Sequence, residues 1–179
     1  MQKLLVTAAL ALGLSSTAFA NTGNIQFKGA ITSGTCSIEI IDPVTGGKMD
    51  NVRMGNVASG RFNTIGDEGN SHPFAMRVTP GTGCDTTTNQ GYVTFKDKYG
   101  AVGAAGELHA LVAGGATNLG LAIKDNTGTL IANGSESNAY DLDDSAPTDM
   151  LFYAAYRAFG IPVTAGDANT DIGFVFDLK

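Results

Sequence analysis

The stretch Asn24-Ile-Gln-Phe-Lys-Gly-Ala-Ile-Thr-Ser-Gly-Thr-Cys36 is the feature around which we interpret the rest of the chain. In an extended chain Ile25, Phe27 and Ile31 fall on one face, with the side-chain-free Gly29 between them. The intervening positions are mostly polar, and the three residues before the cysteine supply no hairpin partner. The pattern therefore predicts a strand whose partner lies elsewhere.

The first 20 residues have the features of a secretory signal peptide. Lys3 precedes an apolar run over residues 4–14, and Ala18-Phe19-Ala20 provides an A-x-A cleavage site. A membrane span is the weaker interpretation, because the run is short and is interrupted by Gly13. Removal of these 20 residues from 179 leaves 159, which is enough for one domain with a sizeable core.

The charge balance argues against two classes of partner. Lys3 is the only charged residue in the leader, so the remaining 159 residues carry 10 basic and 17 acidic side chains, a net charge of −7. An acidic surface disfavours nucleic acid and anionic membranes as partners.

Cys36 and Cys84 are the only cysteines. In an exported protein they most simply form one disulfide, and two free buried thiols are the alternative. The bridge would close a loop of 48 residues, for which the chain-entropy model gives a stabilisation of roughly 4 kcal/mol.

The pattern of apolar residues predicts an all-β fold. The chain has 24 glycines, no tryptophan and many polar turn residues, as expected for short strands joined by tight turns. Alternation predicts strands at 36–40, 51–57, 72–78, 91–99, 119–124, 129–132 and 150–158. Asn126 and Gly128 lie within a predicted hairpin turn.

The cleanest alternation lies at the C-terminus, over residues 170–179. Its four consecutive same-face apolar positions are Ile172, Phe174, Phe176 and Leu178. A solvated tail would be polar, so this segment is expected to be a strand. An ordinary sandwich strand and the border of a binding groove both fit the pattern.

Catalytic and metal-binding motifs are not found in the sequence. His72 and His109 have no second ligand at metal-site spacing, and no nucleophile elbow or phosphate-binding loop is present. The acidic residues Asp141, Asp143 and Asp144 are interpreted as part of a solvated loop, with weak calcium binding as the alternative. We expect no cofactor, no metal and no enzymatic activity, although sequence alone leaves a carboxylate pair for glycoside chemistry open.

Taken together, these segments resemble the subunits of chaperone-usher fimbriae, the type 1 pilus subunit family of Gram-negative bacteria. The residues that carry the resemblance are the leader, Phe27 to Ile31 followed by Cys36, Met54 to Val57, Phe74 to Val78 leading to Cys84, Phe152 to Ala158, and Gly166 with the C-terminal strand.

The resemblance implies an immunoglobulin-like β-sandwich that lacks its seventh strand and is completed by a donor strand. A groove bordered by the C-terminal strand would first be filled by a periplasmic chaperone. At the outer-membrane usher, the N-terminal strand of the next subunit would then replace the chaperone. The implied donor residues are Ile25, Phe27, Gly29, Ile31 and Ser33, and Gly29 matches the glycine that fixes register in the family.

The expected organisation is a signal peptide at 1–20, a donor-strand extension at 21–34 and a pilin domain at 35–179. The expected function is that of a fimbrial subunit, exported to the periplasm and then assembled on the cell surface, that polymerises by donor-strand exchange and supports adhesion. One departure is Leu178, where the family commonly has an aromatic residue. The alternative is a self-contained secreted β-sandwich that binds carbohydrate or a host protein, and a small secreted hydrolase is a third hypothesis.

Overall fold

The computed structural model describes residues 36–87 and 90–179. All described residues belong to one compact unit. The expected signal peptide and the expected donor strand lie outside the described residues.

The described residues form an all-β unit, as the sequence predicts, with a three-residue 3₁₀ turn, η1 (Ser59–Arg61), as their only helical element. Among them, no helix has the length and apolar character of a membrane span. The strands are β1 (Ser37–Ile41), β2 (His72–Thr79), β3 (Gln90–Asp97), β4 (Ala101–Val102), β5 (Leu108–Ala110), β6 (Leu119–Lys124), β7 (Tyr140–Asp141), β8 (Thr148–Ala158) and β9 (Ile172–Leu178).

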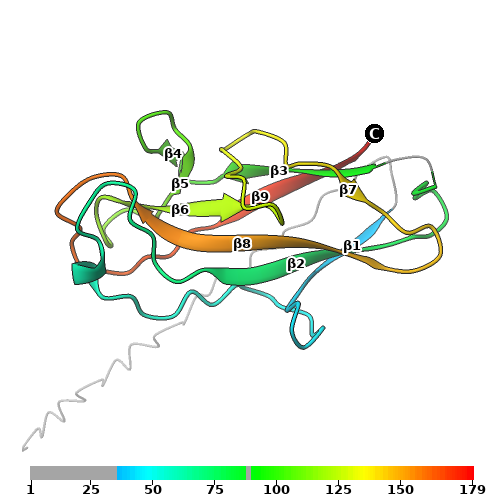
Figure 1. The fold of residues 1–179 in the computed structure, drawn as a ribbon, viewed down its shortest axis with the longest axis horizontal. Helices are drawn as coiled ribbons and strands as arrows, with labels where there is room; N and C mark the ends of the chain where they lie inside the picture. Colours follow the sequence, from blue (N-terminus) through cyan, green and yellow to red (C-terminus); the bar gives the residue numbers. More distant parts are fainter. Residues whose placement is uncertain (1–35, 88–89) are drawn as a thin grey trace, which may run out of the picture. The chain divides into compact units, whose positions relative to one another are not determined.

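Two antiparallel sheets make up this unit (Figure 1). One has six strands in the order β1-β2-β8-β6-β5-β4, and the other has three in the order β7-β3-β9. The long strand β8 pairs with β2 through its first half and with β6 through its second half. This leaves β1 at one edge of the larger sheet and β9 at one edge of the smaller sheet.

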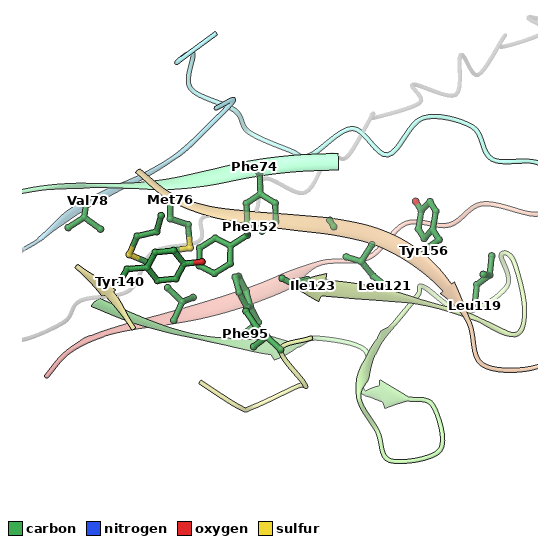
Figure 2. Packing of buried hydrophobic residues seen from close by; sticks show 14 of the residues in the cluster. Phe74, Met76, Val78, Phe95, Leu119, Leu121, Ile123, Tyr140, Phe152 and Tyr156 are labelled. Atoms are coloured by element: carbon green, nitrogen blue, oxygen red, sulfur yellow. The ribbon is translucent and has the colours of Figure 1, made fainter. Parts of the chain in front are cut away.

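The core lies between the sheets, where side chains of both inner faces meet (Figure 2). Phe152 of β8 is fully buried, with its ring centroid 5.5 Å from Phe74 of β2 and 5.3 Å from Phe95 of β3. Tyr140 of β7 packs 5.2 Å from the same ring and donates a hydrogen bond of 2.7 Å to the carbonyl of Leu151. Each such buried apolar side chain contributes about 1.5 to 3 kcal/mol.

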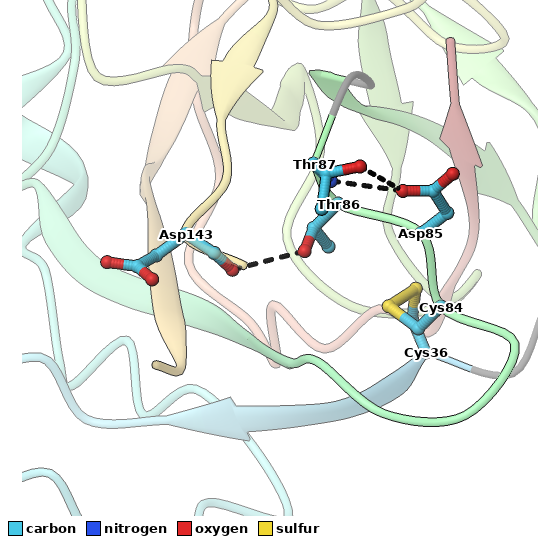
Figure 3. The surroundings of a disulfide bond; sticks show 6 residues. All are labelled: Cys36, Cys84, Asp85, Thr86, Thr87 and Asp143. Atoms are coloured by element: carbon cyan, nitrogen blue, oxygen red, sulfur yellow. Dashed lines mark hydrogen bonds between the residues drawn. A yellow bond between two sulfur atoms is a disulfide. The ribbon is translucent and has the colours of Figure 1, made fainter. Parts of the chain in front are cut away.

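The disulfide joins Cys36 and Cys84, with a Cα–Cα distance of 4.7 Å (Figure 3). It fastens the start of β1 to the segment that follows β2, which confirms the expected pairing and excludes two free thiols. Beside it, the hydroxyl of Thr86 donates to the carbonyl of Asp143 at 3.2 Å.

Two expected strands are not formed as predicted. Residues 51–57 form no ladder with another strand, although Val52, Met54 and Val57 pack against the core, and Gly55 has a positive φ of 63°. The hairpin after β6 is reduced to a single bridge between Lys124 and Leu130. Both segments bury apolar side chains without the continuous ladder that defines a strand.

Candidate functional site

The free edge of β9 is the candidate functional site. Its other edge pairs with β3 over the whole strand, from Gly91 opposite Leu178 to Asp97 opposite Ile172 (Figure 1). Within the described residues no strand pairs with the free edge. The cleanest alternation in the sequence therefore forms an edge strand.

The backbone of β9 presents a regular row of hydrogen-bonding groups to this free edge. Gln90 and Lys179 exchange two backbone hydrogen bonds, of 2.7 and 3.0 Å, just beyond the end of the ladder. Hydrogen-bonded and non-hydrogen-bonded pairs alternate along an antiparallel ladder. The N–H and C=O groups of Ile172, Phe174, Phe176 and Leu178 therefore point away from β3.

The side chains of the same four residues lie on the core face of the sheet. Directly opposite residues share a face, and Phe174 and Phe176 lie opposite Phe95 and Val93, which are both buried. Ile172, Phe176 and Leu178 pack partly buried against the core, whereas Phe174 is 39% exposed. Because Phe174 faces the core and is still this exposed, apolar surface is accessible to solvent at the free edge of β9.

The edge of the larger sheet has a similar arrangement at β1. Ile38 and Ile40 pack partly buried against the core. The carbonyl of Ile40 accepts a hydrogen bond of 2.8 Å from Met49 N, so its backbone points away from β2. By alternation Ile38 also turns its N–H and C=O away from β2. Both sheet edges thus pair core-facing apolar side chains with outward-facing backbone groups.

A cavity of about 260 Å³ lies beside the segment that leads into β9. Its apolar lining includes Val57, Phe62, Leu119, Tyr156 and Val163. Burial raises the pKa of Tyr156, whose hydroxyl donates a hydrogen bond of 2.6 Å to the carbonyl of Ala168. The cavity is therefore a hollow with a mixed polar and apolar lining, close to the N-terminal end of β9.

Two glycines allow a close backbone contact beside this cavity, and one of them, Gly166, lines it. A Cβ on Gly115 would lie 1.9 Å from the carbonyl oxygen of Asp167, and a Cβ on Gly166 would lie 2.6 Å from Ala116 N. Because both lack a side chain, Ala116 N can donate a 2.8 Å hydrogen bond to the same Asp167 carbonyl. This close contact fixes the chain just before β9.

Among the acidic residues Asp141, Asp143 and Asp144, the carboxylate of Asp143 is hydrogen-bonded within its own loop. Asp143 Oδ1 accepts hydrogen bonds from Ser145 N, Ser145 Oγ and Ala146 N, at 2.7 to 3.0 Å. Hydrogen bonds from the Ser145 backbone, and then from its side chain, hold the pKa of Asp143 below its ordinary value. This carboxylate therefore closes a local turn.

The structure brings together only part of the predicted site. The four C-terminal apolar residues lie on one strand, whereas the five expected donor residues lie outside the described range. Nothing in the sequence pointed to the cavity, and the strand predicted at 51–57 is instead an irregular segment whose apolar side chains pack against the core. Only Val52 and Met54 keep the period of two that predicts a strand, and the apolar residues at 49 and 57 fall outside it.

Comparison with known proteins gives a consistent result. A family model described as fimbrial protein matches residues 25–179. The chain is 32% identical to the type-1 fimbrial protein C chain of Escherichia coli, covering 94% of this chain and 92% of that protein. It is 30% identical to long polar fimbria protein A of Salmonella typhimurium, covering 97% and 96%.

Solved structures match the fold. The P pilus rod subunit PapA superposes with a TM-score of 0.60 at 18% identity, covering 80% of this chain and 99% of that chain. A type I fimbria protein of Burkholderia pseudomallei gives a TM-score of 0.56 at 28% identity, covering 83% and 90%.

Proposed function

The chain belongs to the fimbrial protein family, and from this premise we propose that it polymerises by taking a neighbouring chain's N-terminal strand onto the free edge of β9. As a member of this family it is a structural pilus subunit and not an enzyme. It passes through the periplasm to a surface fimbria, with a chaperone and an usher as partners.

The exposure of Phe174 is the observation that carries the proposal. An apolar core-facing side chain and a row of free backbone groups on the same four residues make an edge that favours an added strand. Added strands bind through main-chain hydrogen bonds, and their alternate side chains enter pockets. The periplasmic chaperone would cover this edge before assembly.

The proposed donor is the segment 21–34, with Ile25, Phe27, Gly29, Ile31 and Ser33 facing the core. The donor has five such alternate positions, whereas β9 has four residues that turn their backbone groups toward the free edge. A donor strand in register would therefore place one side chain beyond the end of β9, beside the cavity that residues 163–169 help to line with polar and apolar groups. A fibre of subunits joined in this way would support adhesion of the cell.

Phe27→Arg tests the donor assignment. We expect the variant to fold with its chaperone but to form no fibres, because about 1.5 to 3 kcal/mol of apolar burial is lost and a charge would enter the groove unpaired. The matched control is Gln26→Arg, which places the same side chain on the opposite face of the strand. Fibre formation is measured by electron microscopy and by the ladder of polymers on a gel.

The control should assemble as the wild type does. Normal fibres from Phe27→Arg would contradict the donor assignment, and equal loss in both variants would show that any added positive charge blocks assembly.

A further inference from the structure

A buried acid–base pair connects the two sheets at the end of the unit where β9 begins. Asp97 is the last residue of β3, and its carboxylate contacts Nδ1 of His109 in β5. The side chain of His109 is fully buried, and that of Asp97 is 3% exposed. β3 belongs to the three-stranded sheet and β5 to the six-stranded sheet, so this contact crosses between them (Figure 1).

The pair lies across β9 from the free edge, with Asp97 on the strand with which β9 is paired. Asp97 is opposite Ile172, the first of the four residues that turn their backbone groups toward that edge. At the other end of β9, Leu178 is opposite Gly91, and Lys179 is hydrogen-bonded to Gln90. The two ends of the edge strand are thus fixed by different interactions.

Each member of the pair depends on the other. Within the described residues, His109 Nε2 and Asp97 Oδ2 are buried and make no hydrogen bond, so the Nδ1–Oδ1 contact is the only side-chain hydrogen bond of either residue. Loss of one partner leaves the other buried and unpaired, which is costly. The contact therefore holds the end of β3 against β5.

We propose that Asp97 and His109 are positioning residues for strand addition, which hold the first half of the β9 edge, at Ile172 and Phe174, in register for the incoming strand. This inference rests on the proposed function. The pair acts through β3, on which β9 is aligned. Its loss should weaken the added strand at Ile172 and Phe174 more than at Phe176 and Leu178.

The test is hydrogen–deuterium exchange of backbone amides in fibres assembled from the full mature chain. In wild-type fibres the amides of Ile172, Phe174, Phe176 and Leu178 should all be protected, because each donates to the added strand. In Asp97→Ala fibres we expect about tenfold faster exchange at Ile172 and Phe174, with Phe176 and Leu178 unchanged.

Two further variants separate positioning from general stability. Asp97→Asn keeps an oxygen that can accept from His109 Nδ1, so it should restore wild-type protection. Asp125→Ala removes another fully buried carboxylate, which hydrogen-bonds within the turn after β6, and should leave all four β9 amides protected. If Asp97→Ala forms no fibres, the same amides are measured in the chaperone-bound subunit, with the same expectation.

Protection at Ile172 and Phe174 that survives Asp97→Ala would overturn this inference while leaving strand addition intact. The same holds for uniform loss along β9, or for equal loss in Asp125→Ala. Wild-type fibres without protection at any of the four amides would instead overturn the proposed function.

Discussion

Arg77 and Asp149 show how a single pair of residues adds to the stability of the larger sheet. They lie opposite each other on β2 and β8, and two parallel hydrogen bonds of 2.7 and 2.8 Å join them. The Arg77 side chain, through these hydrogen bonds, holds the pKa of Asp149 below its ordinary value. Both side chains are about one third exposed, so solvent screens much of this attraction.

Asp149→Asn should reduce the dependence of stability on acid pH. A lowered pKa in the folded state gives stability that is present above the ordinary pKa of 3.8 and is lost as the pH falls through the lower folded value. The wild type should therefore lose more unfolding free energy than the variant between pH 7 and acid pH, by less than about 1 kcal/mol.

Urea unfolding at a series of pH values measures this difference. Asp50→Asn, which removes an exposed carboxylate from the loop after β1, is the control and should follow the wild type. Parallel profiles for the wild type and Asp149→Asn would show that the pair contributes nothing to acid sensitivity.

At the scale of elements, paired residues of β3 and β9 contribute differently to the stability of the subunit and to the addition of a strand. Phe174 and Phe95 occupy one rung of the ladder, but Phe95 is 4% exposed within the core and Phe174 is 39% exposed at the free edge. The two phenylalanines should therefore respond differently to truncation.

Phe174→Ala should weaken the fibre more than the subunit. Because much of its ring is uncovered until a strand is added, truncation should cost the isolated subunit clearly less than the 3 to 5 kcal/mol typical of a core phenylalanine. The concentration of urea needed to dissociate fibres should fall. Phe95→Ala is the comparison, and it should lower the yield of chaperone-bound subunit itself. Fibres of Phe174→Ala with unchanged urea resistance would argue against a groove at this edge.

Elements with local patterns were predictable from the sequence, and those made by tertiary contacts were not. β8 and β9 follow from period-two alternation, and the disulfide follows from two cysteines in an exported chain. By contrast, Met54 and Val57 belong to an irregular segment and pack against the core from it. Asp97 contacts His109 only because the two sheets face each other. No periodicity encodes such contacts. The donor residues stay a prediction.

At the scale of the whole molecule, the fold of the described unit leaves apolar residues at an edge of each sheet, and of these two edges the one at β9 has no backbone partner among the described residues. Ile38 and Ile40 on one side, and the four apolar residues of β9 on the other, combine core-facing side chains with backbone groups that point outward, and on the β1 edge Met49 N already bonds to the carbonyl of Ile40. Uncovered edges of this kind are normally avoided because they promote aggregation. A family that hands its subunits from a chaperone to a neighbouring subunit can retain such an edge as its means of assembly.

The most direct test of this account is the urea midpoint of the chain from Thr35 to Lys179, with its disulfide formed, measured with and without a synthetic peptide of residues 21–34. We predict a marked rise in the midpoint with the peptide, since a ligand at 100 times its Kd adds about 2.7 kcal/mol to the free energy of unfolding. The same peptide carrying Phe27→Arg should have little effect. A chain that is already stable alone, with a midpoint that the peptide leaves unchanged, would contradict the claim that this fold is completed by a strand from another subunit.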